Sequence, residues 1–402
     1  MDQQAKVMWD PYTPGYFENP YEHLKDCRNT APIQKAFNNS WFFFRYKNLD
    51  EILSSPHFLV SNLSQYFQEK ESIIFKSSNQ CPYLARGTKL WPMYLDGKIH
   101  LQVRAAIGKS LRWKGFEQTL IEAVEIVNKE YGGNKRFNLV TYCESFLHLV
   151  IKEIIGIKDN ELLEKITIYS NMLAKSQDLY IPKMVYQDIN SWFFWGKGLF
   201  TDSDYFKNLR IYSDENGLDY SEEDIYSITS ISIMAAFETS KDNLSVALYE
   251  ILKTPELIDY VIGCNKHELN LLIEELLRFN SPLQYTVRVN KQPLEYDNKY
   301  IPANSKLYLS LASANRDDEV FMNPNTLIPN RTPNEHLAFG KGAHFCLGAA
   351  IARQELRYCL KPMMQFLKNY SVANDKPVTW SKQIFMRNIE SIEIECNGQW
   401  QT

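Results

Sequence analysis

The sequence has no apolar run of about 18 residues, the length that a membrane-spanning helix needs. Its beginning, residues 1–21, is polar and rich in turn-forming residues, which argues against a signal peptide or membrane anchor. The net charge of −4 gives no reason to expect a nucleic-acid partner. The seven cysteines are scattered and include no Cys-x-x-Cys pair, which favours a reducing cytosol. These absences predict a cytoplasmic protein that binds neither membrane nor nucleic acid.

The chain has 402 residues, of which 45% are hydrophobic and 23% charged, so it is globular. Its length would allow two or three domains, but no repeat, linker or shift of composition marks a boundary. Apolar spacing predicts a mostly helical single domain with a minor sheet. The predicted helices are 99–113, 118–131, 143–156, 221–252, 267–280 and a helix from Cys346 to about 369. Predicted strands are Trp41–Arg45, which runs into a short helix within 38–55, short strands in 283–310 and a hairpin at 378–396. Residues 317–338 are expected to be irregular.

The segment HLAFGKGAHFCLGAAIARQEL, residues 336–356, places one thiol, Cys346, at the start of a helical pattern. Gly340 and Gly342 permit a tight turn with unusual backbone angles, and Gly348 removes a side chain from the first helical turn. Free backbone N–H groups and the helix dipole stabilise a thiolate at such a position. The pattern suits a thiolate that ligates haem iron. The alternative is a structural cysteine buried in a glycine-rich turn.

A second candidate is AAFETS, residues 235–240, in the middle of the longest predicted helix. Glu238 and Thr239 interrupt an apolar run, and the small residues Ala235 and Ala236 would let a flat ligand approach the backbone. A threonine in mid-helix can donate to the carbonyl one turn earlier, and an acid beside a hydroxyl can relay protons. The alternative is that Glu238 and Thr239 belong to a solvated helix face.

Further charged residues gain meaning only in combination. Glu275 and Arg278 stand three apart on a predicted helix and can pair, although an exposed pair of this kind contributes little. Anionic groups such as haem propionates need cationic partners. The candidates for that role are His100, Arg104, Arg288, His336 and His344, each of which, taken singly, is more often a surface charge.

Together these residues resemble the cytochrome P-450 superfamily, the haem-thiolate monooxygenases. Residues 339–348, FGKGAHFCLG, match the family's FGxGxHxCxG haem-binding loop at every fixed position. Glu275 and Arg278 match its ExxR helix, and Arg331 matches the loop arginine that completes this triad. Three segments resemble the oxygen-activating segment, the propionate-binding helix and the ANRD segment: 235–240, 100–104 and 314–317. The resemblance covers nearly the whole chain, from about residue 10 to the C-terminus.

The resemblance implies a fold and a set of roles. The fold is mainly α with minor β, a single triangular cytochrome P-450 domain over 1–402. Haem lies between the long helix at 221–252 and the Cys346 helix. The implied cofactor is haem b with Cys346 as its axial thiolate and metal ligand. The implied catalytic residues are Glu238, Thr239 and Cys346. The residues implied to contact haem are His100, Arg104, Ala235, Arg288, His336, Phe339, His344, Cys346 and Gly348.

One position departs from the family pattern, and a neighbour is unusual. Ala236 stands where the family usually has glycine, and its methyl group would narrow the groove for oxygen. Phe237 is bulkier than expected at its position. Both are compatible with the chemistry, but they could change how tightly oxygen use is coupled to product formation.

The implied activity is that of a soluble bacterial-type enzyme that inserts one oxygen atom from O2 into an apolar organic substrate, as in secondary metabolism. No flavin or ferredoxin module fits in the chain, so a ferredoxin or flavodoxin with its reductase must supply electrons. We expect a monomer. One alternative is a peroxide-driven P-450, against which Glu238 and Thr239 argue. The other is a haem protein that binds or senses without turnover, against which Glu238, Thr239 and Cys346 together argue.

By family analogy the substrate pocket is lined by 60–95, 165–205, the start of the long helix, Leu283–Thr286 and Ile384–Met386. These stretches are rich in aromatic and aliphatic residues, such as SWFFWGKGLF and IFM. We therefore expect an apolar guest, such as a terpenoid, fatty or aromatic compound.

Basic residues gather around the Cys346 helix and at the end of the other haem-contacting helix. They are Lys341, Arg353, Arg357 and Lys361, with Lys109, Arg112 and Lys114. A cluster of one sign steers a partner of the other sign, so these residues predict a docking face for an acidic electron donor.

Overall fold

A computed structural model describes residues 7–36, 40–60, 67, 71–76, 80–111, 114–157, 159–179, 181–196, 198 and 200–397. Arg112 of the predicted basic cluster lies outside these residues. The chain forms two compact units, each assembled from segments far apart in the sequence. Unit 1 comprises Met1–Leu59, Asn128–Cys143 and Asp242–Thr402, and unit 2 comprises Val60–Val127 and Glu144–Lys241. One domain over 1–402 stays a prediction.

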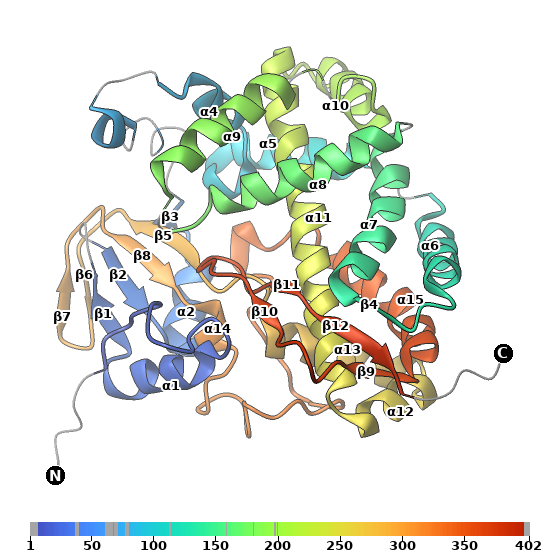
Figure 1. The fold of residues 1–402 in the computed structure, drawn as a ribbon. Coiled ribbons are helices and arrows are strands. Elements are labelled where there is room, and N and C mark those ends of the chain that lie inside the picture. Colours follow the sequence, from blue (N-terminus) through green and yellow to red (C-terminus); the bar gives the residue numbers. More distant parts are fainter. Residues whose placement is uncertain are drawn as a thin grey trace, which may run out of the picture. The chain divides into compact units, whose positions relative to one another are not determined.

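Unit 2 is built from helices (Figure 1). Its complete helices are α4 (Pro82–Gly87), η1 (Pro92–Tyr94), α5 (Gly97–Ser110), α8 (Asn160–Lys175), α9 (Lys183–Gly196) and α10 (Asp204–Glu215). It also holds most of α6 (Phe116–Tyr131), α7 (Leu139–Ile155) and α11 (Glu222–Leu252). Side-chain caps define two of the starts: Asp159 accepts from the Glu161 amide at 2.9 Å, and Ser203 accepts from the Phe206 amide at 3.2 Å.

Unit 1 combines helices with all the described strands. Its helices are α1 (Pro20–Thr30), α2 (Tyr46–Ser54), α12 (Pro255–Gly263), α13 (Lys266–Asn280), α14 (Leu311–Ala314), η2 (Gly342–His344) and α15 (Ala349–Leu367). A capping box starts α13, because Asn265 accepts from the Glu268 amide while Glu268 accepts from the Asn265 amide. This start fixes the helix that carries Glu275 and Arg278.

The largest sheet of unit 1 has the strand order β1-β2-β8-β5-β3. Its strands are β1 (Ile33–Lys35), β2 (Ser40–Phe43), β8 (Lys306–Leu309), β5 (Thr286–Asn290) and β3 (Phe58–Leu59). Only the β2–β8 pair is parallel, so distant parts of the chain lie side by side (Figure 1). Trp41 and Phe43 bury their side chains with Leu49 and Ile52 of α2 and Leu309 of β8. This core supports the strand that carries Arg288.

Three smaller sheets complete unit 1. They are β6 (Leu294–Tyr296) with β7 (Lys299–Ile301), β10 (Thr379–Trp380) with β11 (Ile389–Ser391), and the three-stranded set β4 (Arg136–Asn138), β12 (Glu393–Cys396) and β9 (Tyr370–Val372). The predicted hairpin at 378–396 is therefore only partly right. Thr379–Trp380 and Ile389–Ser391 do form it, but Glu393–Cys396 pairs with the distant β4 and β9.

The prediction of a mainly helical chain with a minor sheet is confirmed. All six predicted helices are present within a few residues of their expected ends, and 317–338 is irregular as expected. Within the described ranges no helix is long and apolar enough to cross a membrane.

Candidate active site

The loop before Cys346 owes its path to two glycines with left-handed backbone angles. The φ angle is +67° at Gly340 and +72° at Gly342, a region that other residues rarely adopt. At Gly342 a Cβ atom would also lie 2.3 Å from the Leu53 carbonyl oxygen at the end of α2. Any side chain there would force the loop away from α2. Glycine at position 342 therefore allows the loop to pack closely against α2.

Cys346 is presented at the surface of this loop. Its backbone N–H donates to the Phe339 carbonyl at 2.9 Å, and α15 begins three residues later. Among the seven cysteines, all of them described, Cys346 is the only exposed one. Its neighbours Phe345 and Leu347 are 41% and 37% exposed. A thiol flanked by exposed apolar side chains and three glycines fits the face of a flat apolar ligand such as haem.

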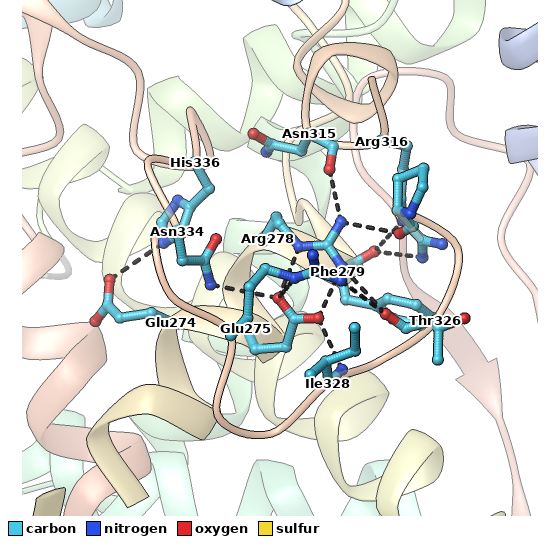
Figure 2. A network of polar contacts seen from close by, with 12 residues as sticks. Glu274, Glu275, Arg278, Phe279, Asn315, Arg316, Thr326, Ile328, Asn334 and His336 are labelled. Carbon is cyan, nitrogen blue, oxygen red and sulfur yellow. Dashed lines mark hydrogen bonds and ion pairs between the residues drawn. The ribbon is translucent and has the colours of Figure 1, made fainter. Parts of the chain in front are cut away.

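Glu275 of α13 lies at the centre of a buried polar network in unit 1 (Figure 2). Arg278 donates to both carboxylate oxygens, with N–O distances of 2.7 and 2.8 Å, and Arg331 donates at 2.9 Å. The backbone N–H of Ile328 and the amide of Asn334 donate to the same carboxylate. One of these four donor residues belongs to α13 and three belong to the irregular segment 317–338. The network therefore holds that segment against the helix.

The two arginines use further N–H groups on backbone carbonyls at the end of α14 and in the irregular segment 317–338. Arg278 donates to Asn315 and Pro324, and Arg331 donates to Met322 and Asn323, at 2.7–3.2 Å. A segment without regular structure has few internal partners for its carbonyl groups. The guanidinium groups supply those partners, which is how the sequence can hold a long irregular path before the Cys346 loop.

A second acid, Glu274, connects α13 to α15 and to the approach to the loop. Arg353 of α15 donates to both of its oxygens at 2.7 and 2.8 Å, and His336 lies at 3.1 Å. Burial alone would raise the pKa of Glu274, but these hydrogen bonds lower it to about 2. The Ala338 N–H donates to Nδ1 of His336, so Nε2 carries the hydrogen directed at Glu274. The sequence patterns did not identify Glu274 as the partner of Arg353 and His336.

The aromatic Phe339 stands over this charged group. The Arg353 guanidinium lies 4.6 Å from the centre of its ring, and the centres of the His336 and Phe345 rings lie farther away, at 6.0 and 6.2 Å. A cation over an aromatic face is attracted by the ring electrons. Phe339 thus connects the predicted haem-contacting residue His336 to the exposed Phe345 beside the thiol.

The remaining predicted haem-contacting residues lie on separate elements. His100 and Arg104 share α5 in unit 2, one turn apart, with His100 buried. Arg288 is buried on β5 in unit 1, where it donates to the Val287 carbonyl at 2.9 Å. His344 lies in η2, two residues before Cys346. The contacts of these residues with haem stay a prediction.

The acid and alcohol of the second motif lie on α11 in unit 2. The Thr239 hydroxyl donates to the Ala235 carbonyl at 2.5 Å, which is the expected bond to the preceding turn. Glu238 is only 1% exposed, so the alternative of a solvated acid is wrong. Its Oε2 lies 2.7 Å from the Lys241 ammonium, which is also buried. Sequence reasoning missed Lys241, although its spacing of three residues from Glu238 was the available signal.

The two unusual positions next to this acid face different surroundings. Phe237 is fully buried and its ring stacks on His148 of α7, with 5.2 Å between centres. Its bulk is therefore accommodated by packing against α7. Ala235 is exposed and Ala236 is half-buried, so the methyl group of Ala236 stays the one departure that could narrow a groove.

Two of the four basic residues predicted to surround α15 are paired with acidic residues. Lys341 pairs with Asp50, and Arg353 pairs with Glu274. Arg357 and Lys361 instead contact neutral oxygens, of the Asn270 side chain and the Cys264 backbone. The positive charge of this surface therefore lies mainly on Arg357 and Lys361.

Comparisons with known proteins show what this chain is similar to. The family model named Cytochrome P450 matches residues 267–395, which include the Glu275 network and the Cys346 loop. The polyketide biosynthesis cytochrome P450 PksS of Bacillus subtilis (strain 168) is 25% identical over 98% of this chain and 99% of its own length. The biotin biosynthesis cytochrome P450 of the same organism is 23% identical over 89% of this chain and 92% of its own.

Solved structures show the same fold. P450BioI, in complex with an acyl carrier protein ligated to hexadec-9Z-enoic acid, has a TM-score of 0.82 at 22% identity and covers 95% of this chain and 99% of its own. Epothilone B-bound cytochrome P450epoK has a TM-score of 0.84 at 20% identity and covers 98% of this chain and 100% of its own. The family model and the curated relatives, which span nearly the whole chain, identify it as a member of the cytochrome P450 superfamily, the haem-thiolate monooxygenases.

Proposed function

We propose that Cys346 is the axial thiolate ligand of haem b in a cytoplasmic, monomeric monooxygenase that oxidises an apolar organic substrate. The observation that carries this proposal is the exposed thiol in a loop shaped by Gly340 and Gly342. A thiolate-ligated haem, when bound, supplies the redox chemistry that cleaves O2. The residues of this chain hold that group, exclude water and move protons.

In this mechanism the two glycines and the Cys346 amide fix the loop that carries the sulfur, and Phe345 and Leu347 would supply apolar contacts to the cofactor. His100, Arg104, Arg288, His336 and His344 would hold its carboxylates and edge. Thr239 orients a proton-bearing water through its hydroxyl oxygen, because its own hydrogen is donated to Ala235. Glu238, next to it, gains and loses the proton.

The ligand assignment is tested by the CO-bound spectrum of the reduced protein. Wild type should show the long-wavelength Soret band that is diagnostic of thiolate ligation, and Cys346→His should lose it. Cys396→Ser is the matched control, because Cys396 is a half-buried cysteine on β12, and it should keep the band. A wild-type protein that shows only an imidazole-type band contradicts the assignment.

An apolar substrate of polyketide or fatty-acyl type fits the relatives, one named for polyketide biosynthesis and one bound to an acyl carrier protein. Within unit 1, an isolated bridge joins Leu283 to Met386, and the Tyr285 and Phe385 rings are 5.3 Å apart. Two of the expected pocket segments are thus paired and apolar. The run SWFFWGKGLF gives less support to an apolar substrate pocket, because Phe194 and Trp195 are 47% and 71% exposed.

A spectral titration with a chemically diverse panel tests the substrate class. Matched acids, in free form and tethered to an acyl carrier protein, belong in that panel. A shift with apolar acyl chains and none with polar compounds of equal size is expected. A preference for the tethered form would identify a carrier-bound substrate, and binding of polar compounds alone would contradict the class.

The electron donor proposed for this enzyme is a ferredoxin or flavodoxin with its reductase. Arg357 and Lys361 supply the positive charge that would steer an acidic donor, and steering weakens with salt because charges beyond about 10 Å are screened at 0.1 M. The variant Arg357→Glu/Lys361→Glu should raise the apparent KM for the donor and flatten its salt dependence. Lys368→Glu, just after α15, reverses one charge away from the loop and is the control for each single reversal. An unchanged salt dependence in the double variant contradicts this docking face.

A further inference from the structure

A buried ammonium group lies beside the proposed catalytic acid. Lys241 of α11 is 8% exposed in its side chain, and its Nζ lies 2.7 Å from Oε2 of Glu238. The other oxygen of that carboxylate, Oε1, is buried and has no hydrogen-bond partner among the described residues. A buried charge needs compensation by a partner. Only one oxygen of the Glu238 carboxylate therefore has a partner within the described part of the chain. The other oxygen could accept a proton or a new hydrogen bond.

A second carboxylate, Glu144 of α7, lies near enough to feel the charge of the same ammonium. The rings of His148 and Phe237 stack with an angle of 14° between their planes, which places α7 next to α11 (Figure 1). Glu144 lies one helical turn before His148, and Lys241 lies one turn after Phe237. Side chains one turn apart share a helix face, so the antiparallel helices bring Glu144 opposite Lys241.

The charge balance of Glu144 agrees with this placement. Burial is the main reason that the pKa of Glu144 is raised, the Lys241 ammonium opposes that rise, and the Glu238 carboxylate adds to it. Other titratable groups on these helices include Asp242, a buried acid that follows Lys241 on α11. They also include His148, whose pKa burial lowers, and Glu164 of α8, which opposes that change. His148 is bonded to Thr167 of α8 at 2.5 Å. One carboxylate is therefore paired with the Lys241 ammonium, and a second lies within its electrostatic reach.

We propose that Lys241 is a positioning residue that alternates between Glu238 and Glu144, and that Glu144 supplies the proton of the relay. In the first arrangement, which has the observed Lys241–Glu238 pair, Glu238 is the carboxylate and Glu144 carries the proton. In the second arrangement Lys241 pairs with Glu144 and the proton resides on Glu238, next to Thr239. This inference rests on the proposed relay role of Glu238.

The exchange conserves atoms and charge. An O–H bond of Glu144 breaks and an O–H bond of Glu238 forms, so the cluster keeps two carboxyl groups, one ammonium and one proton. The ammonium always accompanies the ionised carboxylate, which avoids an uncompensated buried charge. After Glu238 has released its proton toward Thr239, the half-buried Glu144 takes up another from solvent.

Infrared difference spectra of the haem-loaded, substrate-free protein test the cluster without turnover. A pH titration should reveal the carbonyl stretch of a protonated buried carboxyl, and Glu144→Gln should remove it. Lys241→Met removes the ammonium but keeps most of the stem, so Glu238 should take up a proton and add a second signal. That signal should vanish in Lys241→Met/Glu238→Gln, and Lys241→Arg should match wild type.

Lys253→Met is the matched control. Lys253 makes the same kind of three-residue pair with Glu250 at the end of α11, at 3.3 Å, but its side chain is 46% exposed. This variant should add no carboxyl signal. A wild-type signal that persists in Glu144→Gln, or the absence of a second signal in Lys241→Met, would overturn the proposal.

Turnover provides a second readout. Loss of the ammonium lets Glu238 keep its proton to higher pH, so in Lys241→Met the pH profile of product per NADPH should shift upward. Glu144→Gln should lower product per NADPH by about tenfold, less than the about 10²–10⁴-fold that a general acid itself contributes. An unshifted profile in Lys241→Met also overturns the proposal. Expected infrared signals with unchanged coupling in Glu238→Gln would instead leave the cluster standing and refute the relay role.

Discussion

The Glu275–Arg278 pair and the Glu238–Lys241 pair have the same spacing and are both buried, but their carboxylates differ in the number of hydrogen-bond partners. Both join an acid to a base three residues later on a helix, at 2.7 Å. Glu275 accepts from two arginines, one backbone N–H and one amide, so both oxygens have partners. Glu238 has the Lys241 contact on one oxygen, and its other oxygen has none among the described residues.

This difference shows how similar residue pairs serve different purposes. A saturated carboxylate is held in one position, because any movement breaks several charge-assisted hydrogen bonds at once. A carboxylate with one contact can change its partner or its charge at a small energetic penalty. We therefore assign Glu275 a structural role in unit 1 and Glu238 a role in proton movement in unit 2.

The largest expected effect comes from breaking the saturated network. Glu275→Gln leaves two buried guanidinium groups without their anion, and breaking a buried ion pair typically destabilises a protein by about 3–5 kcal/mol. We expect a large fall of the denaturation midpoint and poor recovery of haem-loaded protein. Chemical unfolding, compared with wild type and with Glu238→Gln, measures the effect. A Glu275→Gln protein as stable as wild type would contradict the structural role.

In the same measurement Glu238→Gln should lose less, about 1.5–3 kcal/mol, which is the range for one hydrogen bond to a charged group. The amide oxygen can still accept from Lys241. Equal losses in the two variants would remove the distinction between the pairs.

A smaller effect is expected from Glu274, which has three charge-assisted contacts but is about 30% exposed. Its pKa in the folded protein is about 2, below the usual 4.5. Glu274 therefore contributes stability that is complete above about pH 4.5 and is lost as the pH falls toward 2. Glu274→Gln should flatten the fall of stability in this window, and Glu256→Gln, an exposed acid at the start of α12, should leave it unchanged. An unaltered acid limb in Glu274→Gln would contradict the assignment.

Sequence patterns predicted much of this structure because they are local. The helices with strong apolar spacing, the irregular segment and the glycine loop before Cys346 were all expected, and the left-handed angles at Gly340 and Gly342 explain the two glycines. Several helices were missed, including α8, α9 and α10. In α9, aromatic residues occur on both the buried and the exposed sides, with Phe193 buried and Trp195 exposed, so the spacing gives no clear face.

Long-range partners were beyond the sequence patterns. Nothing in the spacing connects Glu274 with Arg353, 79 residues away, or Glu393–Cys396 with β4 and β9. The motif gave Glu238 but not its surroundings, because burial beside Lys241 depends on how α7 packs against α11. The local chemistry of the site was therefore predictable, whereas the charges that tune it were not.

The most direct test of this contrast measures product formed per NADPH consumed in the haem-loaded Glu238→Gln protein, with an electron donor and a substrate found by titration. The CO-bound spectrum and substrate affinity should match wild type, because Glu238 is not part of the structural network. Coupled product formation should fall by about 10²–10⁴-fold, the usual contribution of a general acid, with electrons diverted to peroxide. Unchanged product per NADPH, or loss of haem binding together with activity, would contradict the account.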